Sequence, residues 1–455
     1  MLSRTEEQAA KGPSRAIRLT GGGEGLNAHP LRDRVANELH ARPFEAVDTP
    51  RRIYHLAFLT DSAAAAEDRD QVTAFCESHG VQPPDPDSKH HRITLGATSL
   101  RWEQHTEFTT YSWESSENAR SAFSHPILSD APFKDMPPPP GPVIGAVHLA
   151  LVHEDDAPPL ESVFDRTSLC VSVLHGGIAR AATDFRQDAY GYTRVLVIDK
   201  GMRPERAGTV VQRLLEIEVY RTLALLGLPE VERIRPQISR IETELNDYVM
   251  DPHDGSLEDN RTLLDRLIAL GTEVESILAA SDYRFSATDA YDAIVDLRLQ
   301  SIHEEGMSGY SRWSSFLARR MKPAIATCQS TRSRLSALSS KLARAADLLR
   351  TRVDIDIEQQ NRDLLKSMDT RAKLQLRLQQ TVEGLSVAAV SYYIVGLVSY
   401  VLSGTDVFGL PVSVPVATAI SVPLVIGFVW WTVRRIRKMN REKGASAAQE
   451  PRFEP

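Results

Sequence analysis

Two long stretches without a charged residue lie near the C-terminal end of this 455-residue chain and constrain its fold more than any other feature. The first covers residues 384–405 and the second covers 407–433, with Asp406 as the only charge between them. About 20 apolar residues are enough for a helix to cross the hydrocarbon core of a bilayer. We therefore predict a two-helix transmembrane hairpin with spans at 384–403 and 415–433. The alternative is a buried helical hairpin inside a globular domain.

The flanks of this hairpin predict its orientation. The connecting loop at 404–414 carries only Asp406, whereas the segments on both outer sides are basic: Arg371, Lys373 and Arg377 before the first span, and Arg434, Arg435, Arg437, Lys438, Arg441 and Lys443 after the second. Short segments rich in Lys and Arg stay in the cytoplasm. We therefore expect a multi-pass membrane protein with cytoplasmic N- and C-termini, a basic cytoplasmic tail at 434–455 and an external loop.

One face of the first span is less apolar than the rest. Small and hydroxyl-bearing residues gather on it: Tyr392, Gly396, Ser399, Tyr400 and Ser403. Such a face suits close packing against another helix, or it lines a pore or cavity. Neither span contains Asp, Glu, Lys, Arg or His, so the sequence does not predict a charge-based ion relay across the bilayer.

Composition excludes several other classes. The net charge of -7 predicts no nucleic-acid surface. The three cysteines, Cys76, Cys170 and Cys328, are isolated from one another, so neither a zinc site nor a disulfide framework is expected. The first 25 residues lack the apolar core of a secretory signal and have no periodic apolar face, so we interpret 1–25 as a disordered leader.

Residues 26–203 mix short strand patterns with a few helical ones. This mixture predicts an α+β cytoplasmic domain with a mostly antiparallel sheet. A polyproline stretch near 137–142 forms a seam within it. The patterns predict strands at 53–59, 99–114, 143–152 and 168–177, and helices at 31–40 and 63–78.

Residues 204–383 predict a helical bundle or coiled-coil stalk. In its last helix, expected at 324–383, apolar residues recur every three or four positions from Leu335 to Val382, with stutters. A long helix cannot bury such a stripe alone, so it must pack on the preceding helices or on other copies of the chain. We therefore expect a homo-oligomer. The preceding helices are expected at 206–226, 230–250, 258–281 and 286–320.

Two groups of polar residues are candidate ligand or metal sites. Glu103, His105 and Glu107 alternate along the strand predicted at 99–114, which would place all three on one face. Such a row could bind a metal or perform acid–base chemistry, or it could be the solvated face of a half-buried sheet. The second group is Glu38, His40 and Arg42, where a helix end could instead dock on the sheet.

Motifs of common cofactor enzymes are absent from the sequence. The glycines at 21–25 lack the Gly-Lys-Ser/Thr ending of a P-loop, and no GxGxxG, HExxH or GxSxG motif occurs. His175-Gly176-Gly177 is interpreted as a turn, because no nucleophile elbow accompanies it. No cofactor and no catalytic residue are predicted.

Four segments resemble those shared by a bacterial family of membrane-anchored proteins that is known as a domain of unknown function. They are HPLRDRVANELHARPF, LRWEQHTEFTTYSW, LLEIEVYRTLALLGLPE and RLQQTVEGLSVAAVSYYIVGLVSY, and the resemblance extends over about 27–440. It implies a location in the bacterial inner membrane. The family has no established activity, so no catalytic residue is carried over.

The predicted order of domains also resembles that of CorA-type divalent-cation channels. Those channels are pentamers with a Gly-Met-Asn filter at the outer end of the first span. This sequence has Tyr400, Val401, Leu402, Ser403, Gly404 and Thr405 in that region, so the filter triplet is absent.

Three functions follow as alternatives. The first is a non-enzymatic tether, sensor or scaffold that contacts the bilayer, other copies of itself and a cytoplasmic protein. The second is a CorA-like cation transporter or channel without the usual filter. The third is a membrane-bound metal-dependent enzyme that uses the Glu103-His105-Glu107 row.

Overall fold

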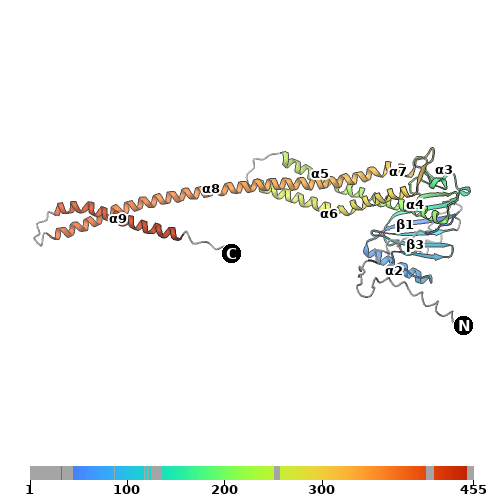
Figure 1. Cartoon of the computed structure of the whole chain (residues 1–455), viewed down its shortest axis with the longest axis horizontal. Coiled ribbons are helices and arrows are strands. Elements are labelled where there is room, and N and C mark those ends of the chain that lie inside the picture. Colours follow the sequence, from blue (N-terminus) through green and yellow to red (C-terminus); the bar gives the residue numbers. More distant parts are fainter. Residues whose placement is uncertain are drawn as a thin grey trace, which may run out of the picture. The chain divides into compact units, whose positions relative to one another are not determined.

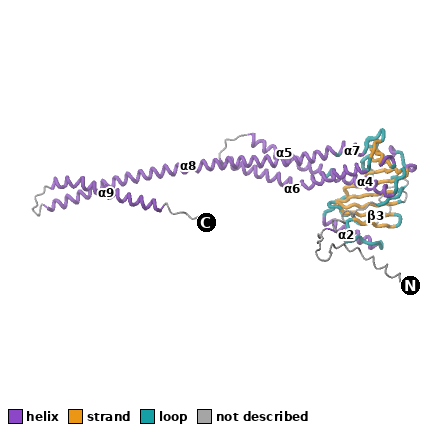
Figure 2. The backbone as a smooth tube through the Cα atoms, viewed as in Figure 1, coloured by secondary structure: helices purple, strands orange, loops and turns teal. Residues whose placement is uncertain are grey.

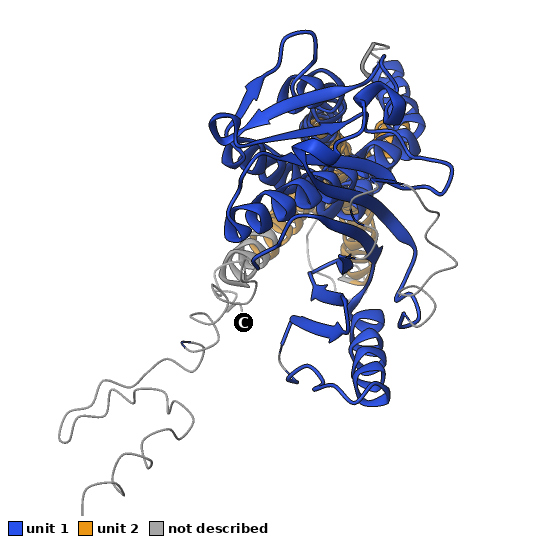
Figure 3. Ribbon diagram, turned by 90° about the vertical axis from the view of Figure 1, so that its right-hand side faces the viewer, with its two compact units in different colours: residues 1–253, 265–346 blue, residues 254–264, 347–455 orange. Residues whose placement is uncertain are grey.

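The computed structural model, whose elements are labelled in Figure 1, has two compact units, which Figure 3 distinguishes by colour. Unit 1 comprises residues 1–253 and 265–346, and unit 2 comprises 254–264 and 347–455. The division therefore cuts the chain within two helices. The domain boundaries expected from the sequence, after residue 203 and after residue 383, remain a prediction. The structure describes residue 32 and residues 45–86, 88–116, 119, 122–123, 136–250, 257–405 and 414–447.

Unit 1 is built on a mixed sheet (Figure 2). Its strands lie in the order β2-β3-β4-β1-β5-β8-β7-β6-β9, and every pair is antiparallel except β5 with β8. The structure thus confirms a mostly antiparallel sheet followed by long helices. The strands are β1 (Arg51–Leu59), β2 (His90–Leu95), β3 (Thr98–Gln104), β4 (Phe108–Ser115), β5 (Val143–His153), β6 (Cys170–Leu174), β7 (Ala179–Thr183), β8 (Thr193–Asp199) and β9 (Glu304–Gly306).

The single long strand expected at 99–114 is wrong. The chain turns at 105–107 instead, where the His105 amide donates to the Phe108 carbonyl over 2.8 Å, and β3 pairs with β4. The physical reason is the spacing of the aromatic residues along the chain. Trp102 and Tyr111 are nine positions apart, so one continuous strand would put them on opposite faces. The hairpin puts them opposite each other on one face, where both are buried.

That aromatic face packs against α2 (Ser62–Ser78). Tyr54, Leu56 and Phe58 of β1 complete the face and contact Val72 and Phe75 of the helix. Asp68 of α2 is fully buried there, and its carboxylate accepts hydrogen bonds from Trp102 Nε1, over 2.7 Å, and from the Tyr111 hydroxyl. Buried carboxylates persist where donors satisfy them in this way.

The opposite face of the sheet packs on helices. These are α4 (Pro204–Ala224), α6 (Leu257–Ser301), α7 (Trp313–Arg320) and the start of α8 (Lys322–Thr405). In α4, apolar residues recur every three or four positions, as expected for a helix with one buried face. Three shorter helices accompany the strands: η3 (Glu154–Asp156), α3 (Leu160–Val163) and η4 (His175–Gly177).

The helical part differs from expectation at one place. Helices were expected at 258–281 and 286–320, but α6 continues without a break to Ser301, and only then do β9 and α7 follow. Nothing between 282 and 285 breaks a helix, and Phe285 is buried. The chain leaves the helix at His303, where φ is 46°. Within unit 1, ion pairs such as Arg334–Glu242 link α8 to α5 (Gly227–Met250).

In unit 2, the end of α8 packs beside α9 (Val414–Ala447). Val387, Val390 and Ile394 of α8 face Phe428 and Val429 of α9. Two helical segments contain stretches that are long and apolar enough to cross a membrane: Trp313–Gly404, which includes α7 and nearly all of α8, and Pro415–Ile436 within α9. Only 6% of each stretch is buried. Pro423 lies inside α9. The loop predicted around Asp406 lies outside the described residues.

Candidate functional site

A cavity of about 200 Å³ lies between the sheet of unit 1 and helix α4. Strands β1, β3 and β4 and the turn after β3 form its floor, α4 forms its roof, and α6 contributes Arg298. Its lining combines charged, polar and aromatic side chains: His55, Glu103, His105, Phe108, Thr110, Gln212, Arg213, Glu216, Val219, Tyr220 and Arg298.

The floor of this cavity is unusual because it is polar and buried. The strand register places His55 opposite Ser112 and Glu103 opposite Thr110, and strand alternation gives all four the face that meets α4. The other face of the same strands carries the aromatic cluster over α2. Burying polar groups costs free energy unless they are hydrogen-bonded. The polar floor therefore needs partners.

Some of those partners lie within the floor. His55 Nδ1 and Ser112 Oγ are 2.7 Å apart, and both side chains are buried. Burial, and then the positive charge of Arg101, lowers the pKa of His55 to about 3, so the imidazole is neutral. Glu114 lies 3.5 Å from Arg92, and burial raises its pKa despite that contact.

The roof is held by interactions of α4. Gln212, Glu216 and Tyr220 recur every four residues and therefore share one helical face. Gln212 Nε2 donates to Glu216 Oε1 over 3.0 Å, and Arg298 Nε lies 2.5 Å from Glu216 Oε2. Burial, and then the nearby charge of Arg298, lowers the pKa of Arg213. One oxygen of the Glu216 carboxylate therefore accepts a hydrogen bond, and the other forms an ion pair with Arg298, although neither Glu216 Oε2 nor Arg298 Nε makes a hydrogen bond within the described part of the chain.

Two buried oxygen atoms at the cavity have neither a hydrogen-bond partner nor an ion-pair partner among the described residues. They are Thr110 Oγ1, on a side chain that is 2% exposed, and Gln212 Oε1, on a side chain that is 7% exposed. Native proteins leave few such atoms, and each calls for an explanation. Glu103 is also buried, and its nearest cation, Arg101 Nε, lies 4.0 Å away, beyond hydrogen-bond distance.

A second, more aromatic cavity of about 380 Å³ adjoins the first. Both are lined by His105, Phe108 and Tyr220. The His105 and Phe108 rings stack with centroids 4.1 Å apart, and Tyr220 meets Phe108 edge-on at 5.9 Å. Tyr291 of α6 stacks on Tyr220 at 5.5 Å. The polar cavity thus has an aromatic wall at one end.

The predicted row of Glu103, His105 and Glu107 is only partly brought together. Glu103 and His105 line the cavity, but Glu107 lies in the turn and accepts hydrogen bonds from Arg284 and Tyr283. Burial raises the pKa of Glu107, but the hydrogen bonds from Tyr291 and Arg284 outweigh it and leave the pKa lowered. Within the described residues, no group of three or more His, Cys, Asp or Glu side chains could hold a metal ion.

The other predicted residues lie elsewhere. Glu38, His40 and Arg42 fall outside the described residues. In the first predicted span, Gly396 and Ser399 are half-buried, Ser403 is exposed, and Tyr400 is 82% exposed. Sequence reasoning missed Thr110 and Gln212. The alternation of Thr110, Ser112 and Glu114 with aromatic residues was an available signal for the polar floor.

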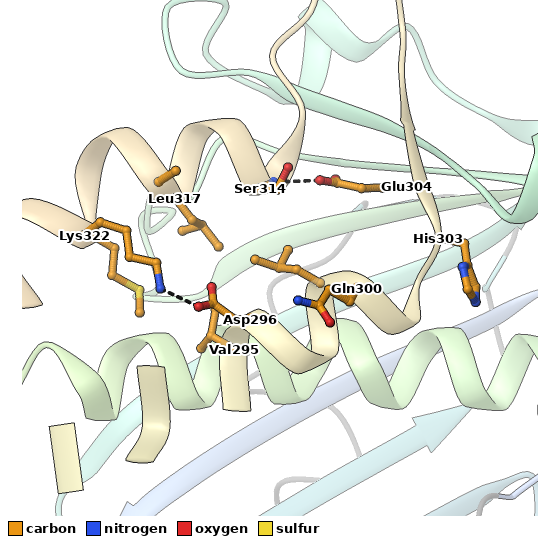
Figure 4. Close-up of a pocket in the computed structure, with 11 residues that line it drawn as sticks. Val295, Asp296, Gln300, His303, Glu304, Ser314, Leu317 and Lys322 are labelled. Atoms are coloured by element: carbon orange, nitrogen blue, oxygen red, sulfur yellow. Dashed lines mark hydrogen bonds and ion pairs between the residues drawn. The ribbon is translucent and has the colours of Figure 1, made fainter. Parts of the chain in front are cut away.

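A larger cavity, of about 390 Å³, lies between the end of α6 and α7 (Figure 4). Its charged side chains are already paired with each other or with the backbone. Lys322 Nζ donates to Asp296 over 2.7 Å and to Asp292 over 2.8 Å, and Glu304 accepts from the Ser314 amide over 3.0 Å. The smaller cavity under α4 is therefore the stronger candidate site.

The orphaned hydroxyl of Thr110 yields a prediction on stability. We expect Thr110→Val to raise the free energy of unfolding by about 1 kcal/mol, because it removes a buried polar atom without a partner. The matched control is Thr109→Val on the same strand, whose hydroxyl lies 3.2 Å from Thr60 Oγ1 and which should lose about 1 kcal/mol. Chemical unfolding of the purified full-length protein measures both, and equal effects would contradict the assignment.

The buried histidines predict a dependence of stability on pH. The pKa of His148 is also lowered to about 3, by burial and then by Arg52 and Arg194. Both histidines have folded pKa values below their unfolded value of about 6.5. Their contribution to the free energy of unfolding is therefore complete above pH 6.5. Each histidine loses about 1.4 kcal/mol of that contribution per pH unit as the pH falls towards 3. Free energies of unfolding measured at pH 7, 6 and 5 test this expectation. His55→Asn should halve the histidine-dependent loss of that free energy per pH unit.

Comparison with known proteins identifies the family of this chain. Neither the curated proteins nor the solved structures gave a match, so these comparisons do not link the chain to CorA-type channels. The family model described as "Protein of unknown function (DUF3422)" matches residues 27–440. That span agrees with the resemblance inferred from the four sequence segments. The chain therefore belongs to the DUF3422 family.

Proposed function

We propose that this protein is a membrane-anchored tether, sensor or scaffold of the bacterial inner membrane, with a large cytoplasmic domain and no enzymatic activity. It is multi-pass and has both termini in the cytoplasm. The observation that carries this proposal is the exposure of the apolar stretches of two helices, of which only 6% is buried within the chain. The core helix of a soluble protein is mostly buried, and these helices are not.

The free energy of apolar side chains supports lipid as the surrounding of these helices. Leu397, Val401, Leu424 and Phe428 are all exposed. Burying one such side chain is worth about 1.5–3 kcal/mol relative to leaving it in water. Soluble monomers rarely expose contiguous apolar patches of more than a few hundred Å². A bilayer removes this cost without a protein partner.

The end of α9 supports the orientation. Arg434 lies over the Trp430 ring at 4.8 Å, and Arg435 lies over the Trp431 ring at 5.3 Å. Tryptophan is enriched at the interface between hydrocarbon and water, and short basic segments remain cytoplasmic. A Trp-Trp pair followed directly by arginines therefore fits the cytoplasmic boundary of the second span.

Two exposed faces of unit 2 support a homo-oligomer. Along α8, the large apolar side chains of the stripe from 364 to 382 are exposed, including Leu364, Met368 and Leu378. Within the span, α9 covers the side of α8 with Val387 and Ile394, and helical spacing places Gly396, Ser399 and Ser403 on the opposite side. Small residues allow close helix approach in membranes. We propose that other copies of the chain cover both faces.

Thiol labelling tests the topology. All three native cysteines are buried, so the background should be low. We expect a membrane-impermeant maleimide to label Gly404→Cys, at the exposed start of the predicted external loop, in intact spheroplasts. The exposed Ser340→Cys in unit 1 should react only after permeabilisation. Labelling of Ser340→Cys in intact spheroplasts, or recovery of the protein in the soluble fraction without detergent, would overturn the proposal.

The stripe on α8 predicts the outcome of a mass measurement in detergent. The native protein should have the mass of an oligomer, and the double variant Leu364→Glu, Met368→Glu should shift towards monomer, because charges at a coiled-coil seam are disfavoured. Lys366→Glu changes the net charge equally but lies on the opposite side of the helix, about 200° away. That control should stay oligomeric. A monomeric native protein would contradict the homo-oligomer.

A further inference from the structure

The cavity under α4 presents hydrogen-bond acceptors that lack a donor. Thr110 Oγ1 and Gln212 Oε1 are buried there without partners among the described residues. The Glu103 side chain beside them is 9% exposed, and Arg101 Nε, the cation recorded next to its carboxylate, lies 4.0 Å away, beyond hydrogen-bond distance. Leaving a buried polar group unsatisfied costs about 1–3 kcal/mol.

These three acceptors come together from two elements. Glu103 and Thr110 are direct cross-strand partners, so their Cβ atoms lie about 4.5–5.5 Å apart on the same face. Gln212 reaches the same cavity from α4 above them, and its amide nitrogen is turned towards Glu216. The free carbonyl oxygen of Gln212 is therefore left to accept a bond within the cavity.

From this arrangement we propose that the cavity under α4 binds a small molecule that carries a primary ammonium group. An ammonium has three N–H donors and no acceptor, which matches Glu103, Thr110 and Gln212. Its positive charge compensates the Glu103 carboxylate, as a buried charge requires. The proposal goes beyond the anchoring role and concerns unit 1 alone, so its outcome is independent of the topology experiment.

The aromatic wall determines the rest of the ligand. Phe108, Val219 and Tyr220 line the cavity beside the three acceptors. Aromatic faces attract cations, and apolar side chains favour an apolar body. An engineered cavity of about 150 Å³ holds benzene, so a cavity of about 200 Å³ suits a molecule of the size of benzylamine. The ligand class is therefore a small arylalkyl- or alkylammonium.

An anionic ligand fits this cavity less well, although arginines line it. Arg298 is neutralised by Glu216 at 2.5 Å. Glu103 and the carbonyl oxygen of Gln212 would repel an anion. Arg298 Nε, which also makes no hydrogen bond to the described residues, is the group through which an anion such as benzoate would bind instead. Water is the other occupant that could satisfy these atoms. Binding measurements on matched probes separate the three possibilities.

The probes are benzylamine, benzyl alcohol and benzoate, with calorimetry and thermal unfolding of the full-length protein in detergent as readouts. Benzylamine should bind and raise the unfolding temperature, because a ligand of the native state stabilises it. Benzyl alcohol should bind at least about tenfold more weakly, since it lacks the charge. Phenylalanine separates a free amine from an amino acid as the source of the ammonium, and weaker binding of phenylalanine than benzylamine assigns the site to free amines.

Variants connect the binding to the named atoms. Glu103→Gln should lower the affinity for benzylamine by at least about tenfold, as expected for the loss of a charged hydrogen-bond partner. Glu107→Gln is the matched control, because that carboxylate is occupied by Arg284 and Tyr283 outside the cavity. It should leave the affinity unchanged. Should Glu103→Gln fail to fold, Thr110→Val serves instead, since it removes an acceptor and should also weaken binding.

Three results would overturn the proposal. The first is benzoate binding as tightly as benzylamine or more tightly. The second is an equal affinity for benzylamine in the native protein and in Glu103→Gln. The third is the absence of benzylamine binding at millimolar concentrations, which would leave water as the occupant of the cavity. None of these results bears on the anchoring role of the two apolar helices.

Discussion

Apolar side chains that find no cover within their own chain set the main physical constraint on this protein. Along the end of α8 and most of α9, only 6% of the apolar stretches is buried. The hydrophobic effect disfavours that surface in water by about 25 cal/mol per Å². The proposed anchor covers this surface with a bilayer, and the proposed homo-oligomer covers it with other copies of the chain. The proposed orientation rests instead on the basic flanks.

Unit 1 meets the opposite difficulty, because it buries polar groups. Strands β1, β3 and β4 carry an aromatic face against α2, where even the buried Asp68 has its donors. Their other face places His55, Glu103 and Thr110 under α4, where the hydrogen bonds are incomplete. Proteins tend to violate the rules of packing at functional sites and to compensate elsewhere. This contrast between two faces of one sheet directs attention to the cavity under α4.

Some parts of this architecture could be predicted from residue patterns and others could not. Uncharged length revealed the two apolar helices, and apolar periodicity revealed α4 and the continuous α8. The turn at 105–107 was missed, although the aromatic residues change from even to odd positions across it, from Trp102 to Tyr111. The same turn divides the predicted row of Glu103, His105 and Glu107, because Glu107 lies in the turn while Glu103 faces the cavity. Neither Thr110 nor Gln212 was singled out.

The sequence by itself determined the local and cumulative properties: the family, the apolar length of two helices, the basic flanks and the alternation of strands with helices. Each of these properties depends on adjacent residues or on the hydropathy and charge summed over a stretch of sequence. Only the tertiary structure decided which polar groups lie together. Thr110 and Gln212 are about a hundred positions apart and meet because β4 pairs with β3 while α4 packs across them. Whether a buried atom has a partner depends on such distant contacts, which no local pattern encodes.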